Sequence, residues 1–229
     1  SMCIRPHLSY AHVFVIFLYG YRKISDPTAV ALVQTYAFRN DAYPPDSIDT
    51  ISGERYMNKT LRLADIVGPI MVGPSSSHTA GAVKIALMTR RLCGACKPTH
   101  VEFKLYGSFA RTYRGHGTDR ALCAGILGWQ PDDLRIRTSL DYAKAHGVDV
   151  KFTPLPDEPY DHPNTVDVEV TDDAGNTFST RGVSIGGGAA VLRRIGDVDV
   201  AITGENTSLV IAQRDVAGVL ASISTVLSR

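Results

Sequence analysis

The sequence lacks the features of several large classes of protein. Four cysteines in 229 residues are too few for a scaffold held together by disulfides, and their number fits a reducing cytosol. Lys and Arg number 24 against 23 Asp and Glu. This balance gives no electrostatic argument for binding nucleic acid, because such proteins usually carry a clear excess of cations. The hydrophobic fraction of 44% is typical of a globular chain.

Residues 1–56 differ in composition from the rest of the chain. Their apolar stretch at 11–21 (AHVFVIFLYGY) is about half as long as a helix that spans a membrane must be. Three interpretations stay open: the core of a signal peptide preceded by Arg5, a buried strand or short helix, or a segment upstream of a natural start at Met57. We therefore divide the chain into an N-terminal extension at 1–56, a main domain at 57–200 and a short C-terminal unit at 201–229.

From residue 61 onward, helical and strand periodicities alternate along the chain. Apolar residues recur at helical spacing in some segments, whereas valines alternate with charged residues in others. The turn DDAGN at 172–176 separates two alternating runs and predicts a hairpin. We expect helices at 78–92, 118–127, 131–146 and from Asp215 onward, and strands at 101–106, 148–152, 166–170, 177–185 and 208–212. This order predicts an α/β fold of mixed α and β elements.

The segment 73–81 (GPSSSHTAG) places three serines and His78 at the expected start of a helix. A helix N-terminus has unpaired backbone N–H groups and a partial positive charge, so it can hold a carboxylate or a phosphate. His78 adds a group that can move a proton near neutral pH. One serine would suffice for an ordinary cap. We therefore expect a substrate-binding or anion-binding site formed by Ser75, Ser76, Ser77 and Thr79.

Two further histidines lie in comparable settings. His116 lies between two glycines, which let the backbone approach a ligand closely, and His162 is held extended by Pro163 just before a strand. Alone, the glycines around His116 are weak evidence, and the segment around His162 is better explained as a turn. Together with His78, all three histidines lie beside Ser, Thr or Asn at the ends of regular elements, where catalytic groups commonly occur. We predict catalytic roles for His78, His116 and His162, and substrate-binding roles for Gly117, Thr118 and Asn164.

Other motifs carry less information. Cys93 and Cys96 have the C-x-x-C spacing of a redox or metal pair. Zinc would normally need a second pair and an iron–sulfur cluster three or four thiolates, so we interpret these two as incidental cysteines at a helix end. The glycines at 186–188 are not followed by the Gly-Lys-Ser/Thr of a phosphate-binding loop, and no G-x-G-x-x-G links a strand to a helix.

Four segments together resemble the β chain or β domain of the bacterial iron–sulfur-dependent L-serine dehydratases, also called L-serine ammonia-lyases. They are DIVGPIMVGPSSSHTAG (65–81), YGSFARTYRGHGTD (106–119), HPNT (162–165) and GVSIGGG (182–188). The resemblance covers about residues 61–229. It implies the α/β domain also seen as the allosteric substrate-binding domain of some phosphoglycerate dehydrogenases. It further implies that 201–229 is a truncated start of an ACT-like domain, whose lone strand and helix would leave a strand edge and an apolar helix face uncovered.

The resemblance also implies an activity, the conversion of L-serine to pyruvate and ammonia with a 4Fe–4S cluster in place of pyridoxal phosphate. The family's cluster cysteines belong to the α chain or domain, and this sequence has no matching segment. We therefore expect this chain to hold no metal and to be inactive without its α partner. We also expect a homo- or hetero-oligomer without nucleic-acid or membrane binding, acting in the cytoplasm in amino acid metabolism and gluconeogenesis.

Two rival functions stay open at this point. The first is a non-catalytic regulatory module that binds an amino acid or an anion at the same helix terminus. It would gain support if His78, His116 and His162 lay far apart. The second, a pyridoxal-phosphate lyase complete in one chain, finds no recognisable lysine or phosphate cup in the sequence. Which histidine acts as the base, or whether a Ser or Thr alkoxide does so, is also open.

Overall fold

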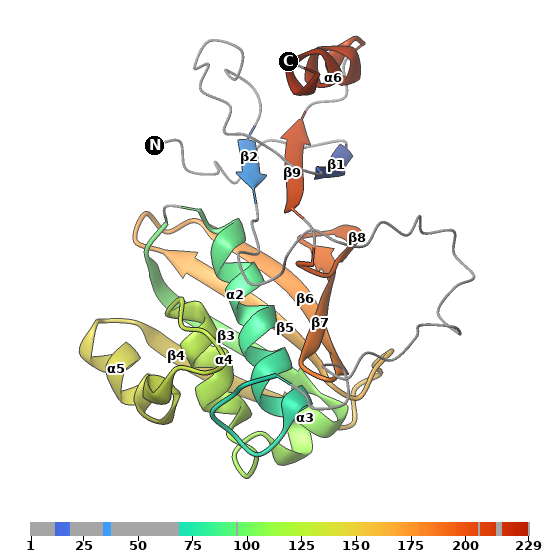
Figure 1. Cartoon of the computed structure of the whole chain (residues 1–229). Coiled ribbons are helices and arrows are strands. Elements are labelled where there is room, and N and C mark those ends of the chain that lie inside the picture. The colour runs from blue at the N-terminus through green and yellow to red at the C-terminus, as the bar shows by residue number, and fades with distance from the viewer. Residues whose placement is uncertain are drawn as a thin grey trace.

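A computed structural model of the chain describes residues 12–18, 34–37, 69–94, 96–205, 207–213 and 217–228. Its main part is a six-stranded sheet in the order β4-β3-β5-β6-β7-β8, with helices packed against one face (Figure 1). Strands β3 and β4 run parallel, and the other neighbouring pairs run antiparallel. The strands are β3 (Pro98–Tyr106), β4 (Asp149–Leu155), β5 (Thr165–Asp172), β6 (Thr177–Gly186), β7 (Ala189–Ile195) and β8 (Val198–Ile202).

Helices α2 (Ala82–Leu92) and α4 (Thr118–Ile126) lie across this sheet and against each other (Figure 1). Glycine allows both close approaches: a Cβ on Gly125 would lie 2.5 Å from the carbonyl oxygen of Val83, and one on Gly182 would lie 2.2 Å from Cγ2 of Ile85. The other helical segments are η1 (Ser76–Gly81), α3 (Gly107–Thr112), η2 (Leu134–Thr138), α5 (Ser139–Ala145) and α6 (Val219–Leu227). No helix within these described ranges is long and apolar enough to cross a membrane.

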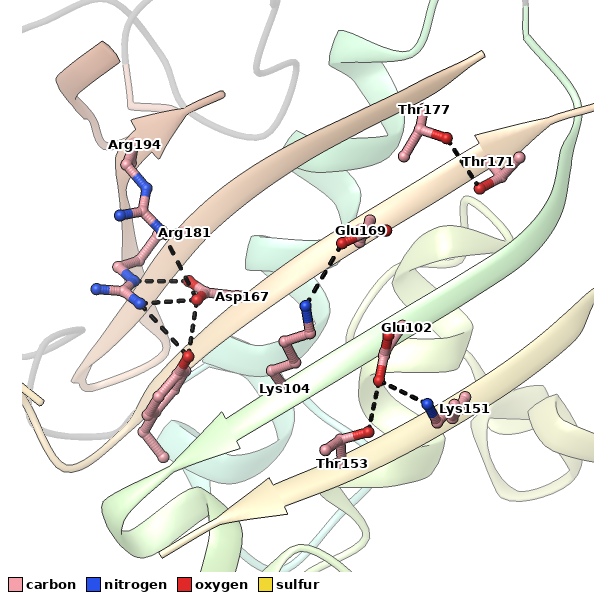
Figure 2. Close-up of polar contacts among 11 residues, drawn as sticks. Glu102, Lys104, Lys151, Thr153, Asp167, Glu169, Thr171, Thr177, Arg181 and Arg194 are labelled. Atoms are coloured by element: carbon pink, nitrogen blue, oxygen red, sulfur yellow. Dashed lines mark hydrogen bonds and ion pairs between the residues drawn. The ribbon is translucent and has the colours of Figure 1, made fainter. Parts of the chain in front are cut away.

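The opposite face of the sheet is polar, because buried and half-buried residues alternate along β3 and β5. Figure 2 shows its paired charges. The Arg181 guanidinium donates to both oxygens of Asp167, at 2.6 and 2.7 Å, and the Tyr106 hydroxyl donates to the same carboxylate at 2.9 Å. Lys104 lies 3.5 Å from Glu169, and Lys151 lies 3.0 Å from Glu102. The charged side chains on this face therefore form ion pairs with one another.

A second, three-stranded antiparallel sheet has the order β1-β9-β2, with β1 at His12–Leu18, β9 at Thr207–Gln213 and β2 at Gln34–Ala37. The apolar stretch at 11–21 is thus a strand over most of its length, the second of the three interpretations above. The expectation that the strand at 208–212 has an uncovered edge is wrong, because β1 pairs with one edge of β9 and β2 with the other. Met57 and Asp215 lie outside the described residues.

The expected elements are largely confirmed, including the hairpin of β5 and β6. The single helix expected at 131–146 is wrong: a turn follows Pro131, and the short η2 precedes α5. The side chain of Asp133 accepts the backbone N–H of Arg135 at 2.9 Å and so caps η2. The sequence analysis also missed α3, β7 and β8. Each is short, and β7 and β8 are joined by a tight turn at Gly196, where φ is +55°.

Candidate active site

The serine-rich turn leads into η1, which continues directly into α2. Ser75 caps this helix: its Oγ accepts the backbone N–H of His78 at 3.3 Å, and its carbonyl oxygen accepts the N–H of Thr79 at 2.8 Å. The predicted helix start is therefore confirmed. Two of the backbone N–H groups that the anion-site argument relied on are already bonded to Ser75, and the Ser77 hydroxyl lies 3.1 Å from Nδ1 of His78. Of the serine hydroxyls, that of Ser76 is therefore the more available donor.

His78 is buried among side-chain hydroxyls on both sides of its ring. Nδ1 lies 3.1 Å from Ser77 Oγ and 3.5 Å from Ser75 Oγ. Nε2 lies 3.0 Å from Thr112 Oγ1 and 3.3 Å from Ser108 Oγ. The imidazole is thus held in one orientation by groups from the serine turn and from α3.

The hydrogen bonds of Thr112 assign the tautomer of neutral His78. Thr112 Oγ1 donates its one hydrogen to the Ser108 carbonyl oxygen at 2.8 Å. With that hydrogen used, the tautomer with the ring hydrogen on Nε2 satisfies the contact between Nε2 and Thr112 Oγ1. Nδ1 then has a free lone pair that accepts from the Ser77 hydroxyl. The pair formed by Ser77 and His78 has the arrangement of a hydroxyl next to its base.

His116 lies beside His78, with ring centroids 4.7 Å apart and an interplanar angle of 79°. Burial lowers the pKa of His78, the nearby His116 lowers it further, and the backbone of Ser108 acts in the opposite direction. His78 is therefore neutral at pH 7 and able to accept a proton. His116 itself is exposed, so it can meet solvent or a partner surface.

The third histidine belongs to a loop that joins this cluster through the backbone. The carbonyl oxygen of Pro163 accepts the N–H groups of Ser108 at 2.6 Å and of Phe109 at 3.2 Å. At the same point, a Cβ on Gly107 would lie 2.8 Å from Cα of Pro163, so only glycine fits there. His162 is half-buried, and burial, followed by the charge of Arg193, lowers its pKa. The structure thus joins His78 and His116 directly and His162 through the residue that follows it.

Ser184 of β6 connects the same loop to the serine turn through hydrogen bonds. Its Oγ donates to the Ser77 carbonyl oxygen at 2.8 Å. Its backbone N–H donates to the carbonyl oxygen of Asn164 at 3.0 Å, and its own carbonyl oxygen accepts from Nδ2 of Asn164 at 3.3 Å. Asn164 is therefore placed in the cluster through Ser184, and its amide is in part used for structure.

Gly117 and Thr118 lie at the start of α4. Gly117 adopts the left-handed conformation with φ of +69°, directly before the helix. Thr118 is fully buried, and its hydroxyl has no hydrogen-bond partner in the described part of the chain; the hydroxyl of Thr79 is in the same situation. Thr79, His116 and Gly117 also line a cavity of about 310 Å³.

The sequence predictions missed three residues of the cluster, Ser108, Thr112 and Ser184. Ser108 and Thr112 lie four residues apart on α3, so one helix face presents both hydroxyls. That spacing was a usable signal once α3 had been recognised. Ser184 gives no comparable signal, because one serine in a strand is common. Only the pairing of strands brings it next to Ser77.

The cysteines do not form a metal site within the described residues. Cys93 and Cys96 pair as a disulfide at the end of α2, which the interpretation as incidental cysteines did not anticipate. Cys123 is buried, and burial raises the pKa of its thiol to about 12, so it is protonated at neutral pH. No three His, Cys, Asp or Glu side chains in the described ranges are grouped so that they could hold a metal ion.

Comparison with known proteins agrees with these motifs. The chain is 43% identical over 164 residues to the "L-serine dehydratase, beta chain" of Peptoniphilus asaccharolyticus, covering 72% of this chain and 73% of the relative. It belongs to the serine dehydratase beta chain family. The family model, "Serine dehydratase beta chain", matches residues 64–151, which include His78, Ser108, Thr112 and His116. The family resemblance and the mixed α and β fold are thus confirmed.

Two further relatives show how the family is organised. The "Probable L-serine dehydratase, beta chain" of Bacillus subtilis (strain 168) is 39% identical over 165 residues, covering 72% of this chain and 74% of the relative. The "L-serine dehydratase TdcG" of Escherichia coli (strain K12) is 41% identical over 71 residues, which are 29% of this chain but 16% of the relative. The family sequence thus occurs both as a beta chain and as a small part of a longer chain.

Proposed function

We propose that this chain is the β subunit of an L-serine dehydratase and contributes the hydroxyl and imidazole groups around His78 to an active site completed by an α chain. The observation that carries this proposal is the neutral, buried imidazole of His78, held between hydroxyls and in ring contact with His116. A module that only binds an amino acid has no need for two adjacent imidazoles. The closeness of His78 and His116 therefore favours an active-site half over the regulatory module.

The proposed reaction is the loss of water from L-serine. The α-hydrogen leaves as a proton and the β-hydroxyl as hydroxide, which gives aminoacrylate. Its imine tautomer then takes up water and yields pyruvate and ammonia. In this scheme Nδ1 of His78 accepts a proton from the Ser77 hydroxyl, so that Ser77 can in turn take a proton from the substrate. His116 and His162 would exchange protons with solvent and orient the substrate.

Substrate binding is proposed for the groups that surround this base. The hydroxyls of Ser75, Ser76 and Ser77 lie at the positive end of a helix, where a carboxylate is stabilised. The loop containing Asn164 supplies an amide at the other side of the cluster through Ser184. Thr79, Gly117 and Thr118 complete the predicted set, with buried hydroxyls on both threonines.

The partner and the cofactor are part of the same proposal. A 4Fe–4S cluster, as the family resemblance implies, would have to be held by the α chain, because the described cysteines of this chain are paired or buried and protonated. Cys3 lies outside the described residues. A cytoplasmic location, a hetero-oligomer, a role in gluconeogenesis and a partial ACT-like unit at 201–229 are likewise proposals. For the last of these, β9 and α6 supply a strand followed by a helix.

The decisive experiment measures L-serine turnover by this chain after assembly with its α partner. Replacing His78 with Gln should lower kcat on the order of 100-fold, because general base catalysis contributes at least that factor. His100→Gln is the matched control, since His100 is half-exposed and bonds to Asp149 at 2.7 Å, and it should change kcat less than about twofold. Equal kcat for the His78 variant and wild type, or no turnover by the assembled wild-type enzyme, would contradict the proposed function.

A further inference from the structure

The turn that joins α2 to β3 contains two cysteines that the proposed reaction does not use. Cys93 caps the C-terminus of α2, Cys96 lies just before β3, and their Cα atoms are 5.5 Å apart. This separation is within the range that a disulfide requires, so the two sulfurs can bond without movement of the backbone. The 11 residues of α2, about 16 Å of helix, lie between this pair and η1. The pair is therefore separate from the proposed serine site.

Hydrogen bonds hold this turn in place without help from the sulfurs. The backbone N–H of Cys96 donates to the carbonyl oxygen of Cys93 at 3.3 Å, and the N–H of Gly94 donates to the carbonyl oxygen of Arg91 at 3.0 Å. The guanidinium of Arg90 donates to the carbonyl oxygen of Gly94 at 3.1 Å. Gly94 itself has a φ of +64°, which favours glycine. The two thiols therefore stay within reach of each other after reduction, so that the bond can close again at little entropic cost.

The chain that follows the pair is fixed to the turn between β5 and β6. The carbonyl oxygen of Lys97 accepts the backbone N–H of Asp173 at 3.0 Å, and the hydroxyl of Thr99 donates to the carbonyl oxygen of Asp172 at 3.1 Å. A disulfide across two intervening residues also closes a short loop, so it restricts the unfolded chain less than a long loop would. Opening and closing of this disulfide can therefore take place on the folded protein.

Access from solvent separates this pair from the third described cysteine. Cys93 and Cys96 are both half-buried, so part of each residue meets solvent. Cys123 is 1% exposed, its Sγ donates to the carbonyl oxygen of Ser139 at 3.3 Å, and burial raises the pKa of its thiol to about 12. Thiol–disulfide exchange needs an accessible sulfur and a thiolate. The fold therefore offers the pair to a small reagent and withholds Cys123 from it.

We infer that Cys93 and Cys96 form a redox-active pair that exchanges reversibly with low-molecular-weight thiols and disulfides. In reduction, the thiolate of a small thiol attacks one sulfur of the pair, which gives a mixed disulfide and the thiolate of the other cysteine. A second small thiolate attacks the small-molecule sulfur of the mixed disulfide and releases a small-molecule disulfide. Two electrons pass to the pair, and the two protons of the small thiols end on the two cysteines. Oxidation by a small disulfide is the reverse of these steps.

Glutathione is the probe that tests the pair. The full chain is equilibrated under nitrogen over a series of ratios of reduced to oxidised glutathione and is then quenched in acid. Differential alkylation followed by peptide mass spectrometry reports each cysteine separately. Cys93 and Cys96 should change together from thiols to a disulfide across the series, whereas Cys123 should stay a thiol at every ratio.

Two variants sharpen this experiment. Cys96→Ser removes the thiol that displaces glutathione from Cys93, so it should raise the yield of the mixed disulfide at Cys93 at least about tenfold over wild type. Cys123→Ala is the matched control, and it should leave the ratio at which the pair is half oxidised unchanged. Circular dichroism of the wild-type chain should be the same in the oxidised and the reduced form, because the hydrogen bonds of the turn remain.

Three results would overturn the inference. A disulfide that stays closed at every ratio and opens only in denaturant would be a purely structural bond. Two thiols that never pair would show that the turn does not bring the sulfurs together, and loss of helical signal on reduction would contradict exchange on the folded protein. The inference does not rest on the proposed function. Because the experiment counts thiols without turnover, its failure is distinguishable from failure of the proposed function, which is measured as kcat of the assembled enzyme.

Discussion

The open face of the sheet and the end of the molecule that carries the histidines differ in how far their polar groups have hydrogen-bond or ion-pair partners. On the open face, Asp167 is bonded by Arg181 and Tyr106, and Lys104 and Lys151 each have a glutamate partner (Figure 2). Around the histidines, the buried hydroxyls of Thr79 and Thr118 have no hydrogen-bond partner within the described residues. Paired groups stabilise a fold, whereas unpaired buried groups cost stability and call for a functional explanation.

The register of β5 and β6 explains why charged side chains on the open face pair with one another. Asp167 and Arg181 are directly opposite on β5 and β6, so the sheet holds the two side chains at contact distance. The groups around His78 come from turns and helix ends, where no ladder sets such a distance. The hydroxyls of Ser75, Ser77, Ser108 and Thr112 bond to His78 and to one another, whereas those of Thr79 and Thr118 lack a partner in the described residues.

The largest expected effect on stability comes from breaking a pair on the open face. Arg181→Ala should lower the free energy of unfolding by about 2 kcal/mol, because it leaves a mostly buried carboxylate with fewer partners. Urea unfolding measures this change, with Arg91→Ala as the exposed control. Turnover of L-serine by the folded, assembled enzyme should stay as in wild type. A stability loss equal to that of the control would show that the pair does not stabilise the fold.

A smaller effect separates a satisfied buried hydroxyl from an unsatisfied one. Thr89 Oγ1 lies 2.7 Å from Thr180 Oγ1 and donates to the Ile85 carbonyl oxygen at 3.1 Å. Thr89→Val should therefore lower the free energy of unfolding by about 1.5 kcal/mol. Thr79→Val removes a hydroxyl without a partner, so it should leave stability unchanged or raise it. Equal losses of unfolding free energy in both variants, measured by thermal unfolding, would show that the two hydroxyls contribute equally to stability.

The smallest expected effect is a difference in pH dependence between the two regions. Because the pKa of His78 is lowered in the folded protein, the unfolded chain binds a proton more readily, and stability falls as pH decreases below the ordinary value of about 6.5. On the open face, the hydrogen bond from Thr153 and the contacts of Lys151 lower the pKa of Glu102, so its contribution is lost only below its ordinary value of 4.5.

His78→Gln should make the free energy of unfolding less dependent on pH above pH 5 and keep its decrease at more acidic pH. Glu102→Gln should keep the dependence above pH 5 and reduce the decrease at more acidic pH. Unfolding free energies measured between pH 3 and pH 8 on both variants provide the comparison. If His78→Gln leaves the dependence above pH 5 intact, another group, with His162 as the next candidate because its pKa is also lowered, accounts for it.

Local sequence signals predicted much of the fold. Helical spacing predicted α2 and α4, and alternation around a polar turn predicted the hairpin of β5 and β6, because each depends on neighbours in sequence. The single helix expected at 131–146 failed where a turn and the capped η2 interrupt the apolar pattern. The expectation that a strand edge is open was wrong for a different reason. Its partners, β1 and β2, lie nearly the whole length of the chain away.

The sequence alone determined which residue types were available for chemistry: a serine-rich helix start and histidines beside hydroxyl or amide groups. The tertiary structure decided how they meet. Ser184 reaches Ser77 across 107 residues, and Thr112 reaches His78 across 34, because strand order and helix packing set those distances. Arg114, Arg120 and Arg137, which are exposed, line one hollow for the same reason. Local periodicity cannot encode such meetings, since they depend on the arrangement of the whole sheet.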